Sequence, residues 1–443
     1  MKELRPEIKV PPPGPKAKAW IERDKKVTSP SYIKEYPLVV ERGEGSWIYD
    51  TDGNRYLDFM AGIAVTSTGH AHPKVVKAVQ DAAAKFLHIC GTDFYYETMV
   101  QLCERLAGYV PDMGPKKVFL TNSGTEAVEG AIKLARYHTR REKIIAFKGA
   151  FHGRTMGAIS LNASKITQRA FFGPLLSGVL HVPYSNPFRC PHKHPRAFCE
   201  KSCECASHLE TDWFPSHTDP KEVAAIFVEP VLGEGGYVFP APKFLKDLRR
   251  ICDQHGILLV FDEVQSGVGR TGDMFAAETF KVAPDIFLSA KGLGSGMPIG
   301  AIVAKEKVMS WQRGTHGSTY GGNPVCCAAA VATLDIVEPL LPHIRSVGEE
   351  MKAGLAELQK KHPVIGDIRG QGLMIGAEFV DPKTNAPAAA LVGDLEQLAF
   401  REGLLLLSCG QSTIRFAPPL IITSHEVKVG LEILDKCLTQ LTK

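Results

Sequence analysis

The sequence predicts an α/β protein with a large domain on a mainly parallel central sheet and a smaller α+β domain. Apolar runs such as VAAIFVEP and GILLVFDE are typical of strands that are buried on both faces of a parallel sheet. Strands and helices alternate through the middle of the chain, which is the pattern of an α/β domain. A length of 443 residues also exceeds one ordinary compact core, so we expect two or three domains.

Residues 1–75 are expected to form an N-terminal arm and part of the small domain. The arm covers about the first 35 residues and is broken by PPPGP. After the arm, alternating polar and apolar residues around the turn DTDGN predict a small antiparallel meander.

The large domain is expected to span residues 76–335. Helices are predicted over PKVVKAVQDAAAKFLH and ETMVQLCERLAGYV, followed by the strand KKVFLTN and the helix TEAVEGAIKLARYHT. Later strands are predicted at KIIAFKG, VAAIFVEP, GILLVFDE, DIFLSAK and GAIVAKE. Residues 336–443, which include GLMIGAEFV, LLLLSCG and TIRFAPPL, are expected to complete the small domain.

Composition argues against several classes of protein. The net charge of +4 is spread along the chain, which gives no sign of nucleic-acid binding. The N-terminal stretch lacks the apolar core of a signal peptide, and no run approaches membrane-spanning length, so we expect a cytoplasmic protein with no membrane contact. The eleven cysteines are too few and too scattered for a disulfide scaffold.

A lysine surrounded by small residues, in LSAKGLGSGMPIG, marks a candidate site. Lys291 follows a predicted strand and should lie at the carboxyl edge of the sheet, where open α/β folds bind ligands. The preceding strand ends in Asp262 and Glu263, and a buried acid needs a partner or hydrogen bonds. A lysine taken alone is more often a solvated loop residue, so the prediction depends on its neighbours.

The segment VFLTNSGTEAVEGAIKLAR predicts a strand, a turn of small residues and a helix. Ser123 stands three residues before Glu126, which is the spacing of a capping box. Backbone N–H groups and the helix dipole would face a ligand above Ser123, Gly124 and Thr125, and this arrangement binds phosphate. An ordinary capped helix fits the same residues.

An amine, an acid and a phosphate-binding helix start together predict pyridoxal 5′-phosphate. The motifs NSGTEAVEGAIKLAR, FHGRT, EPVLGEGG, LVFDEVQSGVGRTG, the lysine after LSA and GSTYGGNP occur in the order seen in class III (subgroup III) aminotransferases. The chain resembles this family over nearly its whole length. The resemblance implies an enzyme of fold type I, with the small domain built from both termini.

By this resemblance, Lys291 forms the Schiff base with the cofactor and later moves the substrate proton. Asp262 would keep the pyridine nitrogen protonated, so that the ring can accept electrons. Burial and a nearby cation would lower the pKa of the lysine toward neutrality. Gln265 is expected to bind the phenolic oxygen of the cofactor.

Other positions of the same resemblance complete the cofactor site. Phe151 would stack on the ring, and the neighbouring His152 belongs to the same binding set. Ser123, Gly124 and Thr125 would hold the phosphate. Thr319 matches the residue that such enzymes send to the partner subunit's phosphate, which implies an obligate homodimer and leaves higher assembly open.

Substrate specificity is assigned by resemblance to Ile63, Arg154, Glu229, Ser318 and Arg415. Arg415 would bind the α-carboxylate of glutamate or 2-oxoglutarate bidentately. With a donor that carries its amine at the far end, Glu229 would cover Arg415, and Arg154 would take the distal carboxylate. Ile63 stands where ornithine aminotransferases are expected to carry a tyrosine.

The C-terminal segments FVDPKTNAPAAA and REGLLLLSCGQSTIRFAPPL resemble those of 4-aminobutyrate aminotransferases. We therefore expect transfer from 4-aminobutyrate to 2-oxoglutarate by a ping-pong mechanism. Acetylornithine or ornithine transamination, and racemisation of amino acids, are the alternatives within the family.

An insertion at residues 188–210 could bind a metal. The set Cys190, Cys199, Cys203 and Cys205, accompanied by His192 and His194, could supply soft ligands to zinc or an iron–sulfur cluster. The paired C-x2-C spacing of zinc ribbons is absent, so a surface loop with incidental thiols is the alternative.

Two other functional classes are less well supported. GVGRTG, at residues 267–272, fits the G-x-G-x-x-G pattern of a nicotinamide dehydrogenase. Five residues separate it from Phe261, where the apolar run ends, and it does not open a helix directly after the strand. A metal-binding interaction protein without catalytic activity would leave Lys291, Asp262 and the phosphate turn unexplained.

Overall fold

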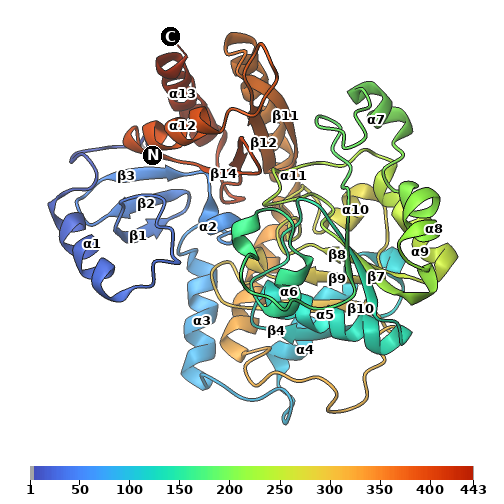
Figure 1. The fold of residues 1–443 in the computed structure, drawn as a ribbon. Helices are drawn as coiled ribbons and strands as arrows, with labels where there is room; N and C mark the ends of the chain where they lie inside the picture. The colour runs from blue at the N-terminus through green and yellow to red at the C-terminus, as the bar shows by residue number, and fades with distance from the viewer. Residues whose placement is uncertain (1–3, 443) are drawn as a thin grey trace.

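The computed structural model describes residues 4–442 and contains three β-sheets, which Figure 1 shows with their helices. The largest has seven strands in the order β4-β10-β9-β8-β7-β5-β6. Neighbouring strands are parallel except where β10 pairs with β4 and β9, so the predicted mainly parallel sheet is confirmed. The strands are Lys116–Thr121 (β4), Lys143–Phe147 (β5), Val179–Val182 (β6), Val223–Val228 (β7), Leu258–Asp262 (β8), Ile286–Ser289 (β9) and Gly300–Lys305 (β10).

Both faces of this sheet are covered, which explains the continuous apolar runs. Every residue of β7 and β8 is buried. On one face, Ile144, Phe227 and Val260 pack with helix α5 (Gly124–Thr139). The opposite face, including Phe261, belongs to the main core. A sheet enclosed in this way exposes its strand ends, rather than its faces, to a ligand.

The small domain joins the two ends of the chain. The predicted meander forms as β1 (Val40–Glu44), β2 (Trp47–Asp50) and β3 (Arg55–Asp58), and β13 (Leu404–Leu405) adds to it parallel to β3. The third sheet has the order β11-β12-β15-β14. Its strands are Ile365–Gln371 (β11), Met374–Phe379 (β12), Leu407–Cys409 (β14) and Thr413–Phe416 (β15).

Helices account for most of the remaining elements. The arm contains α1 (Pro15–Val27), which the sequence did not predict. The others are Ala61–Ala64 (α2), Pro73–Lys85 (α3), Glu97–Gly108 (α4), Met156–Leu161 (α6), Arg196–Ser202 (α7), Phe214–Ser216 (α8), Phe244–His255 (α9), Ala276–Phe280 (α10), Pro324–Lys361 (α11), Ala389–Arg401 (α12) and Ser424–Leu441 (α13). Single turns are Pro111–Met113 (η1), Ile166–Gln168 (η2), Leu209–Trp213 (η3), Pro220–Glu222 (η4) and Lys291–Leu293 (η5).

Helix α11 runs through the boundary that we placed between residues 335 and 336. It is one helix of 38 residues, although Pro339 and Pro342 lie inside it. Among residues 4–442, it alone has the length and apolar composition of a membrane span, although we expected no run of that length from the sequence, and 56% of its most apolar window is buried inside the protein. It packs against α3, α4, α13 and β11, so the protein's own elements cover its apolar side chains.

Close packing of α11 against the third sheet gives a test of the fold. A Cβ added at Gly348 would lie 2.1 Å from the carbonyl oxygen of Gly372, whereas one added at Gly393 in α12 would meet nothing within 4 Å. We expect Gly348→Ala to lower the free energy of unfolding by about 1–3 kcal/mol through overpacking. Gly393→Ala should raise it by about 1 kcal/mol, because alanine is the better helix former. Denaturant titration of both variants measures the difference, and equal effects would contradict this packing.

Candidate active site

The ends of two neighbouring strands bring the predicted lysine and aspartate together. Asp262 is the last residue of β8, and Lys291 follows β9 after one intervening residue. The two strands are parallel, with Asp262 opposite Leu288. Lys291 has φ +43°, in the left-handed region, so the chain turns sharply where the strand ends.

A cavity of about 250 Å³ lies at this edge of the sheet. Ten of the residues predicted from the sequence line it: Ser123, Gly124, Thr125, Phe151, His152, Arg154, Glu229, Asp262, Gln265 and Lys291. Gly153 and Val264 complete the lining. The predicted residues Ile63, Ser318, Thr319 and Arg415 are not part of the lining of this cavity.

The environment of Lys291 favours a neutral amine. Burial lowers its pKa, and the positive charge of Arg415 lowers it further against the opposing charge of Asp262. A neutral amine is the nucleophilic and proton-accepting form of lysine. The side chain is therefore suited to covalent and proton-transfer chemistry.

Asp262 is held by a buried histidine. His152 Nδ1 and Asp262 Oδ2 are 2.7 Å apart, and both residues are buried. Burial opposes the charged form of His152, but its hydrogen bond to Asp262 and the charges of Asp262 and Glu229 outweigh burial and raise its pKa. The other oxygen, Oδ1, accepts from the Val264 N–H at 3.1 Å. These contacts orient the carboxylate toward the cavity.

The start of α5 forms the predicted small-residue turn. Ser123 is the N-cap, and its hydroxyl accepts from the Glu126 N–H at 3.3 Å. The reciprocal half of the predicted capping box is different, because Glu126 Oε2 accepts from the Asn122 N–H at 2.8 Å. Thr125 Oγ1 lies 2.8 Å from Thr155 Oγ1 and ties this turn to the FHGRT loop. Ser123, Gly124 and Thr125 line the cavity, so the start of the helix lies where an anion site requires it.

The contact with Arg415 that we predicted for Glu229 is made by Glu234, to which we assigned no role. Glu229 does not cover Arg415; its carboxylate accepts from the N–H groups of Phe151 and Gly233, both at 2.8 Å. The residue that pairs with Arg415 is Glu234, whose Oε2 is 3.0 Å from Nη2. The two glutamates stand in the same motif, EPVLGEGG, but only the second pairs with Arg415. Burial raises the pKa of Glu229 to about 7.

Arg415 is a buried cation with unused donors. Its Nη2 also donates to the Ser408 carbonyl at 3.0 Å. Its Nε and Nη1 are buried and have no partner in the structure. Because a buried donor without an acceptor is costly, these two groups point to an anionic ligand.

The remaining predicted residues lie around the cavity. Arg154 is exposed, with its guanidinium 5.5 Å from the centre of the Phe151 ring. Ile63 has φ +66° in the left-handed turn of α2, a strained conformation for a β-branched residue. Ser318 Oγ accepts from Asn122 Nδ2 at 3.3 Å and from the Gly321 N–H at 2.9 Å. Thr319 is exposed.

The insertion forms no metal site in the structure. Across residues 4–442, no group of three or more His, Cys, Asp or Glu side chains is arranged to hold a metal ion. Cys203 and Cys205 belong to the main core, Cys199 is buried, and Cys190 is half-buried. His192 stacks on the His208 ring at 3.9 Å, and the His194 ring packs on Phe198.

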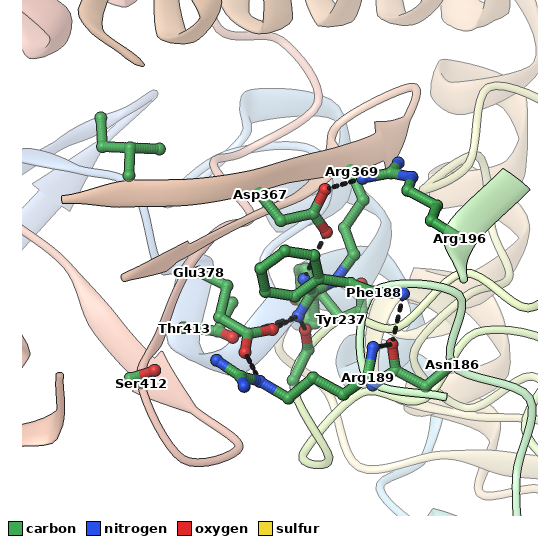
Figure 2. Close-up of polar contacts among 12 residues, drawn as sticks. Asn186, Phe188, Arg189, Arg196, Tyr237, Asp367, Arg369, Glu378, Ser412 and Thr413 are labelled. Atoms are coloured by element: carbon green, nitrogen blue, oxygen red, sulfur yellow. Dashed lines mark hydrogen bonds and ion pairs between the residues drawn. The ribbon is translucent and has the colours of Figure 1, made fainter. Parts of the chain in front are cut away.

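Charged residues fasten this insertion to the third sheet, as Figure 2 shows. Arg189 pairs with Glu378, and Arg196 Nη1 is 2.6 Å from Asp367 Oδ1. Arg369 lies between these acids, 2.7 Å from Asp367 Oδ2 and 2.8 Å from Glu378 Oε2. It also donates to the carbonyls of Gly236 at 2.6 Å and Tyr237 at 3.0 Å. The network therefore holds the turn that carries Glu234.

Comparison with known proteins agrees with the resemblance seen in the sequence. A model of the class III aminotransferase family matches residues 29–438. The chain belongs to this family. It is 40% identical to an alanine/serine racemase of Pyrococcus horikoshii, covering 98% of this chain and 92% of that protein. It is also 40% identical to the 4-aminobutyrate aminotransferase GabT of Escherichia coli, covering 91% and 94%.

Solved structures agree with the fold and the cofactor. An amine transaminase from an uncultivated Pseudomonas species in its PLP-bound form has a TM-score of 0.85 and 32% identity, covering 91% of this chain and 95% of that one. The fold is thus fold type I, and the cofactor is pyridoxal 5′-phosphate. The dehydrogenase alternative is wrong. Within GVGRTG, Arg270 is buried and donates to the Leu373 and Pro418 carbonyls, so the motif serves structure.

The cavity fits this cofactor on its own chemistry. Gln265 and His152 line the cavity, and Gln265 Oε1 and His152 Nε2 are buried there without a protein partner. A Cβ at Gly124 would lie 2.8 Å from Val264, so glycine keeps the turn close to the cavity floor. An amine, a carboxylate and a helix start at three sides match the aldehyde, ring nitrogen and phosphate of the cofactor.

Glu263, the acid that follows Asp262 at the end of β8, has a structural role that can be tested by the pH dependence of stability. It is fully buried and accepts from the N–H groups of Ala276 at 2.6 Å and Ala277 at 2.7 Å. Burial raises its pKa from 4.5 to about 7. The stability that it contributes is therefore complete below pH 4.5 and is lost as the pH rises through 7, by about 3 kcal/mol.

Glu263→Gln removes this titration, so the free energy of unfolding should fall less between pH 4.5 and 7 than in the wild type. Urea unfolding of the holoenzyme at fixed protein and cofactor concentration gives the two pH slopes. Identical slopes would show that Glu263 does not titrate in this range.

Proposed function

We propose that the protein transfers the amino group of an ω-amino acid, with 4-aminobutyrate as the donor, to 2-oxoglutarate. The products are the semialdehyde and glutamate, formed in two successive half-reactions. The observation that carries this proposal is Arg415, a buried guanidinium with two unpaired donors and a carboxylate, Glu234, on its third nitrogen. A cation that can be either covered or free suits two substrates of different shape.

The two half-reactions would use the arginines differently. An α-carboxylate, as in glutamate, replaces Glu234 and binds Arg415. A donor with its amine at the far end has no carboxylate near the reacting carbon, so Glu234 stays on Arg415. The distal carboxylate of such a donor then binds Arg154, which is exposed at the cavity and has no side-chain ion pair in the described chain.

The cofactor, when bound, supplies a reactive aldehyde and a ring that accepts electrons. Lys291 Nζ would hold that aldehyde and would carry the proton of the substrate carbon. Asp262 would hold a proton on the ring nitrogen, and His152 fixes the orientation of Asp262 through the 2.7 Å contact. Gln265, Phe151 and the start of α5 would hold the remaining edges of the cofactor.

Racemisation is the second candidate, because a racemase matches 98% of the chain at 40% identity. Both activities need the same lysine and cofactor, so the donor decides between them. Incubation of the holoenzyme with 4-aminobutyrate, 5-aminovalerate, ornithine, acetylornithine, lysine or alanine, each with 2-oxoglutarate, tests the assignment. Loss of optical activity from alanine without 2-oxoglutarate would favour the racemase.

We also propose that the enzyme works as a homodimer in the cytoplasm. Exposed apolar side chains near the cavity and on the arm support a subunit interface, among them Trp20, Tyr32, Ile33, Tyr95 and Tyr320. Thr319 is exposed next to Tyr320, where it could reach a partner's phosphate. Assembly beyond the dimer stays open.

Arg154→Ala should weaken use of 4-aminobutyrate much more than use of glutamate. The variant removes the cation that binds the distal carboxylate and leaves Arg415 in place, so the expected loss in kcat/KM for 4-aminobutyrate is about tenfold to a hundredfold. The rates of each half-reaction, followed by cofactor absorbance with a single donor, measure the difference. Equal loss for both donors would contradict the role of Arg154.

Glu234→Ala should shift donor preference toward α-amino acids. The variant leaves Arg415 uncovered, so an α-carboxylate no longer has to displace Glu234 and its KM falls, while the KM for 4-aminobutyrate rises. Glu229→Ala is the matched comparison, because Glu229 holds backbone N–H groups rather than Arg415. An unchanged ratio of glutamate to 4-aminobutyrate in Glu234→Ala would refute the switch.

A further inference from the structure

Glu234 lies between two cations. Its Oε2 is 3.0 Å from Arg415 Nη2, and its Oε1 is 2.9 Å from Lys165 Nζ. Burial disfavours its charged form, but Arg415 and Lys165 together outweigh burial and lower its pKa. Glu234 is therefore an ionised carboxylate with a separate partner for each oxygen.

The two cations differ in how far their side chains are exposed to solvent. The Arg415 side chain is 5% exposed, whereas that of Lys165 is 45% exposed. Lys165 lies between α6 and η2, in a segment tied to the edge of the cavity, since Ala163 N donates to the Ala150 carbonyl at 2.9 Å. The lysine is thus a partly exposed positive charge in a segment anchored next to Phe151, which lines the cavity.

A substrate carboxylate that binds Arg415 would leave Glu234 without its arginine partner. Its side chain is only 17% exposed, so a released carboxylate is poorly hydrated where it stands. An ionised carboxylate in that position needs a second cation or must move into water. In the structure, the second cation is already at hydrogen-bond distance on the opposite oxygen.

We propose that Lys165 is a specificity-determining residue that retains Glu234 when an α-carboxylate displaces it from Arg415. This inference rests on the proposed function and names a second partner for the same switch. While Glu234 covers Arg415, it has two charged partners, Arg415 and Lys165. Once a substrate carboxylate occupies Arg415, Lys165 is the one charged partner that Glu234 retains. Removing Lys165 therefore costs more in the half-reaction with glutamate than in the half-reaction with 4-aminobutyrate.

The test is Lys165→Met, with Lys143→Met as the matched control. Lys143 forms a comparable surface ion pair, 2.6 Å from Glu222, and Glu222 is not the acid that pairs with Arg415. For Lys165→Met we expect the KM for glutamate to rise about two- to fivefold, which is the range for a partly exposed ion pair. The KM for 4-aminobutyrate should change less, kcat should hold in both half-reactions, and Lys143→Met should match the wild type.

A double variant shows whether Lys165 acts through Glu234. In a Glu234→Gln background the residue has no charge to retain, so Lys165→Met should no longer alter the KM for glutamate. Persistence of the effect in that background, or equal losses for both donors in the single variant, overturns the inference.

The same measurements separate this inference from the proposed function. If the wild-type holoenzyme reacts with glutamate but not with 4-aminobutyrate, the proposed donor is wrong. The role of Lys165 is still decided in that case, by the change that Lys165→Met causes in the KM for glutamate and by the absence of this change in the Glu234→Gln background. A wild type that does not react with glutamate overturns both.

Discussion

The site depends on two parallel strands that end together. β8 and β9 are in register, with Asp262 opposite Leu288, and this places Asp262 and Lys291 on one edge of the sheet. Because side chains alternate along a strand, a shift by one residue would turn Asp262 away from the cavity. Both strands are buried along their whole length.

The buried acids around these strand ends have polar partners. Asp262 is paired with His152, Glu229 accepts two backbone N–H groups, and Glu234 lies between Arg415 and Lys165. Arg369 supports the last of these arrangements, since it binds the Gly236 and Tyr237 carbonyls beside Glu234. Arg415 Nε and Nη1, which an anionic substrate would meet, are buried without a partner. The pocket is therefore prepared for an anionic, flat ligand.

The sequence was most informative where local pattern decides the outcome. Apolar runs predicted the strands, and the residues at their ends predicted Lys291 and Asp262. The pairing of Arg415 was beyond such reasoning, because EPVLGEGG offers two glutamates and a turn held by Arg369 from a distant strand selects the second. Likewise, Lys165 carries no motif, and its proximity to Glu234 is set by tertiary packing. Two of the four thiols of the insertion, Cys203 and Cys205, lie in the main core, which their spacing in the sequence does not show.

The pairing of β3 with β13 has a consequence for how the protein is made. Leu57 pairs with Leu404, so a strand near the beginning of the chain completes its sheet with one near the end. A ribosome delivers the first partner long before the second, and the meander stays open while nearly all other residues emerge. Closure of so long a loop is slow, so the small domain can finish only after translation is almost complete, when the large sheet already exists as a template.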